Sequence, residues 1–327
     1  MRAVPGAGCI FTVDLLIVPG AHKRTGPDRA LPDNVSQLSS RERVVGPLST
    51  GLLVLTHLSC LLVFVVPFSW AVVELACFGY VLRMWAITAG YHRYFAHRSY
   101  RTHRVFRFVL AWLGASAMQN GPLWWASVHR RHHKHSDGPL DPHSPTRGFW
   151  DSHFGWLLSG RYNGLDLSNV RDLSSQPALR FVERWSWVPV ITHALVCFAL
   201  AGWAGVVWGF AVSTVALLHA TALVNSLAHT WGGRRYETGD LSRNNALLAV
   251  LTLGEGWHNN HHHIQSSARQ GFFWWEVDVT YYVLKLLALV GVVHGLREPT
   301  AAAVEGPRVK PIGGKSRDHA ERATGLE

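Results

Sequence analysis

Long apolar stretches alternate with polar segments along the chain. The first stretch runs from Leu48 to Tyr91, and Pro67-Phe68-Ser69 divides it into two pieces of about 20 residues, the length that crosses a bilayer core. The second runs from Phe181 to Ala228 and contains a turn at Ala201 to Gly205. Each stretch therefore predicts a transmembrane hairpin. The predicted spans cover residues 48–66, 69–91, 181–200 and 206–227.

Two shorter apolar stretches are predicted to lie at the membrane surface. Val105 to Trp125 is interrupted by Gln119 to Pro122, and a span there would place the flanking histidines on opposite sides of the membrane. Tyr281 to Leu296 has the same character. Residues 47–296 are thus predicted to form one membrane domain, with a disordered cytoplasmic leader at residues 1–46 and a disordered cytoplasmic tail at residues 297–327.

Positive charge flanks the apolar stretches and is missing from both hairpin turns. Lys and Arg exceed Asp and Glu by 31 to 21, which gives a net charge of +10. The positive-inside rule then places both termini and all the histidine clusters on the cytoplasmic side of a multi-pass protein. No nucleic-acid-binding motif accompanies the charge, so nucleic acid is not an expected partner, and an anionic membrane surface is.

Histidine is abundant, with 20 residues gathered mainly at 92–103, 129–143 and 258–263. The second and third groups contain histidines at i, i+3 and i+4, which places three rings on one helix face. The first group has i, i+5 spacing, which on an ideal helix splays the rings by about 140° and therefore requires a helix end. Asn225 and His229, at i and i+4, lie at the cytoplasmic end of the fourth predicted span.

These positions predict a site for two metal ions, because ten ligands are too many for one. The candidate metal ligands are His92, His97, His129, His132, His133, Asn225, His229, His258, His261 and His262. His263 points about 100° away from His262 on a helix and is expected to be a bystander. Isolated histidines inside the spans, such as His57, His193 and His219, are expected to be packed residues.

The ligand types favour two irons that react with O₂. The four cysteines lie far apart, so no disulfide framework, thiolate cluster or copper(I) site is predicted. A zinc hydrolase needs three ligands and an open position rather than a surplus of imidazoles. A membrane zinc hydrolase acting on lipid amides is nevertheless kept as an alternative, with about one metal per chain. A non-catalytic lipid-binding protein is disfavoured because every ligand position is filled.

Several motifs resemble those of the membrane-bound fatty acyl desaturases, in particular the stearoyl-CoA type Δ9 desaturases. The resemblance covers Leu48 to Leu296, and HNNHH has the form typical of bacterial members, which implies the inner membrane of a bacterium as the location. It implies an all-α integral membrane protein with four transmembrane helices and a cytosolic helical cap that holds a di-iron centre. The ligands that it implies are the same ten, with Asn225 acting through a water. The motifs are GYHRYFAHRSY, HRRHHKHSDGPLDPHS, RGFWDSHFGWLL, NSLAH and GEGWHNNHH.

The reaction implied by the resemblance inserts a cis double bond into a saturated fatty acyl chain, with O₂ as co-substrate and two external electrons. No catalytic residue separate from the metal ligands is expected. The chain has no His-Pro-Gly-Gly haem segment and no cysteine cluster, so the electron donor is expected to be a separate protein of the ferredoxin or cytochrome b5 type. A hydroxylase or acetylenase of the same superfamily is the closest alternative. A basic patch is a candidate docking site for the donor, with a solvated flank as the alternative: Arg130, Arg131, Arg234 and Arg235.

Further positions match the substrate tunnel and the surroundings of the metals in this family. Gln119, Trp125 and Thr221 match the residues that enclose the bend in the acyl chain, which favours Δ9. Met84 stands where the animal enzymes carry a small side chain, which predicts a shallower tunnel and a preference for shorter chains. Asn120 matches a residue that contacts the substrate, and Tyr80 matches the residue that closes the tunnel. The candidates for orienting the histidines are Asp137, Asp141 and Glu255.

Two departures leave the acyl carrier open. The stearoyl-CoA enzymes hold CoA with an Arg-Asp pair and with two adjacent basic residues. This chain has Ser127-Val128 and Gly160-Arg161 at those positions. The carrier is therefore CoA, acyl carrier protein or a glycerolipid.

Overall fold

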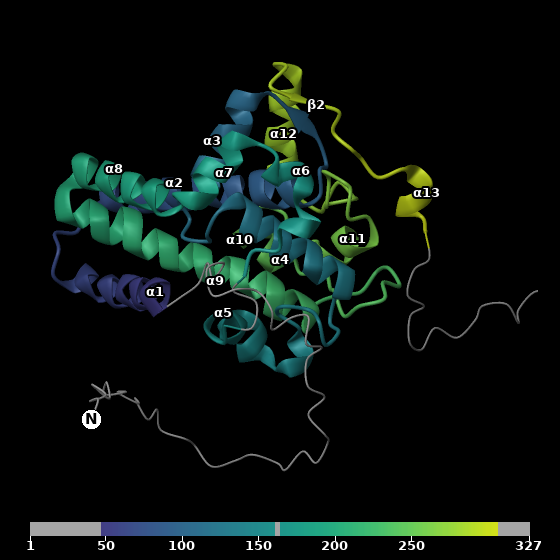
Figure 1. Ribbon diagram of the computed structural model, residues 1–327, viewed down its shortest axis with the longest axis horizontal. Helices are drawn as coiled ribbons and strands as arrows, with labels where there is room; N and C mark the ends of the chain where they lie inside the picture. Colours follow the sequence, from purple (N-terminus) through teal and green to yellow (C-terminus); the bar gives the residue numbers. More distant parts are fainter. Residues whose placement is uncertain (1–46, 161–163, 307–327) are drawn as a thin grey trace, which may run out of the picture. The chain divides into compact units, whose positions relative to one another are not determined.

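The computed structural model describes residues 47–160 and 164–306 (Figure 1). The predicted leader at residues 1–46 lies outside the described residues, and so does the predicted tail from residue 307. Within the rest of that tail, Ala301–Val304 form a short helix, α13. Its first turn is capped by the Thr300 side chain, which accepts a hydrogen bond from Ala303 N, and the Tyr236 hydroxyl donates to Val304 O at 2.8 Å. These hydrogen bonds explain why this segment forms a helix, although its composition predicted disorder.

The apolar stretches form long helices. α1 (Pro47–Ser59) continues into η2 (Cys60–Phe64), and α2 (Trp70–Trp85) continues into η3 (Ala86–Ala96). In the second half of the chain, the helical elements follow one another without a loop: α8 (Trp187–Gly205), η7 (Val206–Val212), α9 (Ser213–Ser226) and η8 (Leu227–His229). Figure 1 shows α1, α2, α8 and α9 grouped at one end of the molecule.

Two helices in the described part of the chain are long and apolar enough to cross a membrane, Trp70–Ala96 and Trp187–His229. The second is broken at the predicted turn, because Gly202 has φ +57°, a left-handed conformation that glycine adopts without strain. α1 with η2 forms a shorter apolar helix. Phe181 belongs to a separate helix, α7 (Pro177–Arg184), so the third apolar helix begins later than expected. The four-span arrangement remains a prediction.

The remaining helices carry or support the histidines. The two predicted surface stretches contain α3 (Arg104–Ala115) and α12 (Val279–Leu289). A two-residue strand, β1 (Arg101–Thr102), pairs antiparallel with β2 (Val293–His294). The other elements are α4 (Pro122–His135), η4 (Pro145–Arg147), η5 (Asp151–Gly155), α5 (Trp156–Leu158), η6 (Leu167–Asn169), α6 (Arg171–Ser174), α10 (Ala246–Leu251) and α11 (His258–His263).

The buried core lies where η3, α3 and α4 meet, and it includes Tyr91, Phe95, Leu110 and Leu123. The outer helices instead expose large apolar side chains. Phe64, at the end of η2, is 87% exposed. The core thus lies beside the histidine-bearing helices, and the long helices carry an apolar exterior.

Candidate metal centre

The structure brings nine of the predicted ligands together in two adjacent groups of imidazoles. In each group, one ring nitrogen from every residue lies within 4.8 Å of the others. The rings come from η3, α4, η8 and α11, elements far apart in sequence. The five-histidine cluster is His92, His97, His129, His133 and His261. The four-histidine cluster is His132, His229, His258 and His262.

The local backbone explains how His92 and His97 share the first group despite their i, i+5 spacing. η3 is a π-helix, and His97 N donates to His92 O at 3.1 Å. A π-turn is wider than an α-turn and brings residues five apart towards the same face. The sequence predicted a helix end here. In the structure the helix ends in a π-turn, and this turn brings His92 and His97 towards the same face.

Within the five-histidine cluster the Nε2 atoms converge. The Nε2 atoms of His97 and His133 lie 2.9 and 3.0 Å from that of His129. The Nε2 atom of His261 lies 2.9 Å from that of His133 and 3.1 Å from that of His92. A neutral ring nitrogen that carries a proton can donate a hydrogen bond to only one of two such neighbours. An arrangement of this kind therefore brings the lone pairs of several Nε2 atoms together.

The four-histidine cluster has the same character. His258 Nε2 lies 3.0 Å from His229 Nε2 and 3.1 Å from His262 Nε2. His132 Nε2 lies 3.4 Å from His262 Nε2. One ring nitrogen from each residue of this group thus lies close to those of the other three.

These separations fit metal ligands. Two imidazole nitrogens bound at about 2.1 Å from one ion are about 3.0 Å apart if their bonds form a right angle and about 3.4 Å apart in a tetrahedron. Most of the observed Nε2–Nε2 distances match the value for two metal–nitrogen bonds at a right angle. Five imidazoles also exceed the four ligands of tetrahedral zinc. The five-histidine cluster therefore fits an ion that accepts more than four ligands, and the four-histidine cluster offers four imidazoles to a second ion.

The rings are also held in the form that binds a metal. Burial, together with the neighbouring imidazoles, keeps the pKa values of His129, His133, His258 and His261 well below the ordinary histidine range. These rings are consequently neutral near pH 7. A neutral imidazole offers its lone pair to a cation without first losing a proton.

Four carboxylates fix the orientation of four of the rings. The Nδ1 atoms of the histidines donate to them, which leaves Nε2 to face the cluster. The pairs are His92 with Glu255 at 2.5 Å, His132 with Asp141 at 3.0 Å, His229 with Asp137 at 3.1 Å and His262 with Asp240 at 2.7 Å. Three of these carboxylates are the ones that the sequence singled out.

Asp240 was missed because it belongs to no histidine motif. It lies in the loop before α10, and its carboxylate accepts hydrogen bonds from the Thr238 hydroxyl at 2.9 Å and from Ser242 N at 3.0 Å. A polar loop between two ligand-bearing segments is the only signal in the sequence. His143 was missed as well. Its ring lies 4.4 Å from that of His132, beside Asp141.

Glu255 is part of a buried network of charges. Arg93 donates to Glu255 Oε1 at 3.1 Å and to Asp278 Oδ2 at 3.1 Å. Burial opposes ionisation of the Glu255 carboxyl, but the charges of His92 and Arg93 hold its pKa at about 2. The group that orients His92 is therefore itself fixed and ionised.

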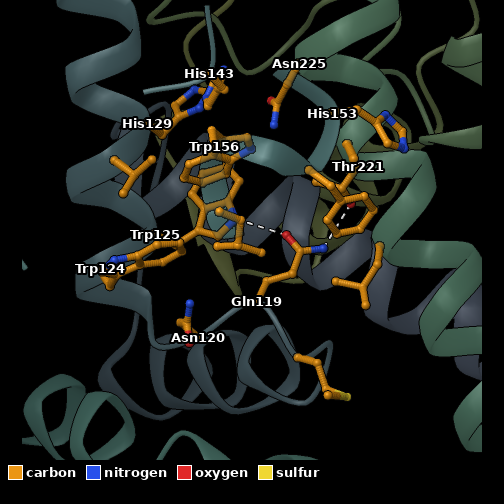
Figure 2. A pocket seen from close by; sticks show the side chains of 16 residues that line it. Gln119, Asn120, Trp124, Trp125, His129, His143, His153, Trp156, Thr221 and Asn225 are labelled. Atoms are coloured by element: carbon orange, nitrogen blue, oxygen red, sulfur yellow. Dashed lines mark hydrogen bonds between the residues drawn. The ribbon is translucent and has the colours of Figure 1, made fainter. Parts of the chain in front are cut away.

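Two cavities adjoin the metal centre, and Trp125, His129, Thr221 and Asn225 line both of them. In the first, the His129 cavity, Gln119 links two neighbours (Figure 2). Its Nε2 donates to Thr221 Oγ1 at 3.0 Å, and its Oε1 accepts from Trp125 Nε1 at 3.1 Å. Figure 2 shows Asn225, His129 and His143 on the same side of this cavity. Asn225 thus lies beside the imidazoles, on α9 and four residues before His229.

The second cavity, the Met84 cavity, extends past His92 and His258 to Met84, whose side chain is buried. Tyr80, one helical turn earlier, donates its hydroxyl proton to Leu251 O at 2.7 Å. Asn120 lines the His129 cavity, and its carbonyl accepts a hydrogen bond from the Tyr91 hydroxyl at 3.0 Å.

The arginines of the predicted basic patch have structural partners. Arg130 donates to both oxygens of Asp172, at 2.8 and 3.0 Å. Arg131 pairs with Asp166, and Arg235 pairs with Glu276. Arg234 donates to backbone carbonyls in its own loop. These contacts give the arginines a role in holding the fold together, which neither the docking patch nor the solvated flank predicted.

The chain is similar to known desaturases over most of its length. The model of the fatty acid desaturase family matches residues 68–290, which include every candidate ligand. An acyl-CoA 5-desaturase of Anemone leveillei is 42% identical over 237 residues, 71% of this chain and 74% of that protein. An sn-1 stearoyl-lipid 9-desaturase of Anabaena variabilis is 40% identical over 74% of this chain and 90% of its own, and Delta-9 acyl-lipid desaturase 1 of Arabidopsis thaliana is 36% identical over 75% and 81%. The protein therefore belongs to the fatty acid desaturase family and is an oxidoreductase.

Proposed function

We propose that this protein uses O₂ to insert a cis double bond, at Δ9, into a saturated fatty acyl chain held beside two iron ions. The observation that carries the proposal is the pair of histidine clusters beside two cavities. His129 lines the cavity that contains Gln119, Trp125 and Thr221, and His92, His132 and His258 line the Met84 cavity. Saturated methylenes have no acidic proton, so general-base catalysis by the surrounding carboxylates cannot remove hydrogen from them. The irons would supply the O₂-dependent oxidation, with electrons from a separate ferredoxin or cytochrome b5 type protein.

The residues around the ions hold the rings in place. Asp137, Asp141, Asp240 and Glu255 fix the tautomer by accepting the Nδ1 proton, so every oriented ring presents Nε2 to the cluster. Asn225 lines both cavities beside the clusters, and its amide would act on a metal ion through a bound water. We propose these ten ligands and four carboxylates as the complete metal site.

The cavity residues position the acyl chain. The hydrogen bonds from Trp125 to Gln119 and from Gln119 to Thr221 join three elements of the cavity wall at one place. Because the cavity wall is closed at this place, an acyl chain that passes the metals has to bend. The bent acyl chain presents to the metals the two hydrogens whose removal gives a cis double bond. Related desaturases are named for positions 5 and 9, so the Δ9 assignment rests on this triad.

Met84 supports a preference for shorter acyl chains. Its side chain is 1% exposed and lines the second cavity, on the helix that also carries Tyr80. We propose that Met84, with Tyr80 behind it, ends the tunnel at the methyl end of the substrate. Palmitoyl or myristoyl chains would then be converted faster than stearoyl chains.

The membrane arrangement is part of the proposal. Four spans with both termini and the metal centre on the cytoplasmic side agree with the apolar helices and with the distribution of Lys and Arg. The break at Gly202 supports a hairpin in the long segment Trp187–His229.

The test is expression in a desaturase-deficient host, with double-bond position determined by mass spectrometry of the fatty acids. We expect a Δ9 monoene, and His261→Ala should abolish it. An hydroxylated fatty acid in place of the alkene would support the alternative hydroxylase, and an alkyne would support an acetylenase. The ratio of iron to zinc in the purified protein tests the remaining alternative, because a lipid-amide hydrolase would contain about one zinc per chain.

A further inference from the structure

The His129 cavity reaches from the metal centre to residues that touch α1. Met118, Phe154 and Leu218 line the cavity together with His129 and Asn225. The Thr56 hydroxyl of α1 lies 3.7 Å from the sulfur of Met118. The ring of His57, also on α1, packs edge-on against Phe154 with ring centroids 6.2 Å apart. α1 therefore covers part of the cavity wall.

α1 turns an apolar face away from the rest of the protein. Leu55 and Leu58 are 59% and 57% exposed, and they flank the two residues that touch the cavity wall. Besides Thr56, the inward contacts of α1 include His57 Nε2, which lies 3.3 Å from His219 Nε2 on α9. These contacts involve no carboxylate or ammonium group. In the proposed membrane arrangement, α1 lies between this part of the cavity and the lipid.

The cavity offers no positive charge to a phosphate-rich carrier. Its lining residues in the described part of the chain include no Lys or Arg. One wall is formed by Trp124, Val128, Trp156 and Leu157, with the two indoles stacked at a centroid distance of 6.1 Å. Binding of the phosphates of CoA in water normally uses Arg or Lys. An apolar and aromatic wall is instead suited to acyl chains and to the ester region of a lipid.

We propose that the substrate of this site is an acyl chain of a membrane glycerolipid, which enters the His129 cavity from the bilayer past α1. The ester bond to glycerol remains intact, and the chain returns to the bilayer carrying the double bond. This proposal rests on the proposed function and chooses among the acyl carriers that the relatives' names include, acyl-CoA and acyl-lipid. Entry requires α1 to move away from Met118 and His219, the contacts of Thr56 and His57 on the cavity side.

The carrier is tested with the full-length, iron-loaded protein in vesicles, supplied with a ferredoxin and its reductase. In one sample the vesicles contain phosphatidylglycerol with an isotope-labelled palmitoyl chain and an oleoyl chain. In the other, labelled palmitoyl-CoA is added to dioleoyl-phosphatidylglycerol vesicles. We expect initial conversion of the lipid-bound chain to exceed that of the thioester by at least about tenfold.

The two outcomes against the proposal have different meanings. Faster conversion of palmitoyl-CoA, with the alkene recovered as a thioester, overturns the glycerolipid proposal and leaves the desaturase function standing. Absence of alkene in both samples, with the metal site loaded, overturns the desaturase function and the glycerolipid proposal together.

The route past α1 is tested by a cross-link between α1 and the cavity wall. The double variant Thr56→Cys with Met118→Cys is joined by a short thiol-reactive cross-linker that a reductant cleaves. We expect cross-linking to lower desaturation of the lipid-bound chain at least about tenfold and cleavage to restore it. The matched control is Met118→Cys alone carrying the same reagent, which puts the reagent at the cavity wall without joining it to α1 and should lower the rate much less. Full activity of the cross-linked protein would overturn entry past α1.

Discussion

At the scale of single residues, the carboxylates show how ligand geometry depends on groups outside the histidine motifs. Asp240 accepts the Nδ1 proton of His262 at 2.7 Å and is itself fixed by Thr238 and Ser242. The histidines were predictable because their spacing places them on common helix faces. Asp240 was not, because it meets His262 through a loop whose path no local pattern specifies.

Replacing Asp240 tests this role. We expect Asp240→Ala to lower iron affinity and desaturation by about 10- to 100-fold, because His262 loses the acceptor that holds its ring. Asp240→Asn keeps an acceptor oxygen and should recover part of the loss. The measurements are bound iron per chain and the rate of alkene formation. Unchanged iron content in the alanine variant would show that His262 is oriented without this carboxylate.

Met84 is the second residue whose effect is local. Met84→Ala removes a buried side chain from the end of the Met84 cavity, so longer chains should fit. We expect the ratio of stearoyl to palmitoyl conversion to rise by about tenfold or more, since a missing group of this size in an apolar pocket changes discrimination by about 1–3 kcal/mol. Met84→Leu, with nearly the same volume, is the matched control. An unchanged product profile in the alanine variant would place the end of the tunnel elsewhere.

At the scale of the elements, the order of the helices followed from hydrophobic pattern, whereas their special turns did not. The π-helical stretch Ala86–Ala96 has no signature in composition, yet it aligns His92 with His97. α4, which carries three ligands, begins at Pro122, a favourable first position, and its N-terminus is buried against Glu183. Glu183 comes from α7, so the contact depends on tertiary packing that the sequence of α4 cannot reveal.

Glu183 links the stability of α4 to pH. Its Oε2 accepts hydrogen bonds from Leu123 N at 2.8 Å and Trp124 N at 3.2 Å, and a Cβ at Gly121 would collide with it. Burial raises the pKa of its carboxyl from 4.5 to about 7, although the two N–H donors partly offset the effect. The folded state therefore favours the protonated acid. Stability from this group is complete below pH 4.5 and is lost as pH rises to about 7, with a total change of about 3 kcal/mol.

Glu183→Gln tests this linkage, because glutamine keeps an acceptor for the two N–H groups and does not ionise. We expect the melting temperature of the wild type, relative to that of the glutamine variant, to fall between pH 5 and pH 7. Parallel melting curves for the two proteins over this range would mean that Glu183 ionises as easily in the folded protein as in the unfolded one.

At the scale of the whole molecule, the metal centre joins segments that are far apart in sequence. The five-histidine cluster takes rings from η3, α4 and α11, and the four-histidine cluster takes rings from α4, η8 and α11. The predicted membrane topology was enough to predict that these elements meet, because each histidine motif follows an apolar stretch and lies on the same predicted side. The division of the rings between two clusters required the fold, since neighbouring His132 and His133 belong to different groups.

Metal binding should therefore stabilise the fold as a whole. The imidazole nitrogens of the two clusters lie 2.9–3.4 Å apart, close enough for one cation to bind several of them at once. A ligand that binds only the folded state adds about 4 kcal/mol of stability at a thousand times its dissociation constant. We expect chelation of iron from the detergent-solubilised protein to lower the melting temperature by several degrees, and Fe²⁺ to restore it. His263→Ala, outside both clusters, should respond to chelation as the wild type does, whereas His261→Ala should respond less. An identical melting temperature with and without iron in the wild type would show that the clusters are held by the protein alone.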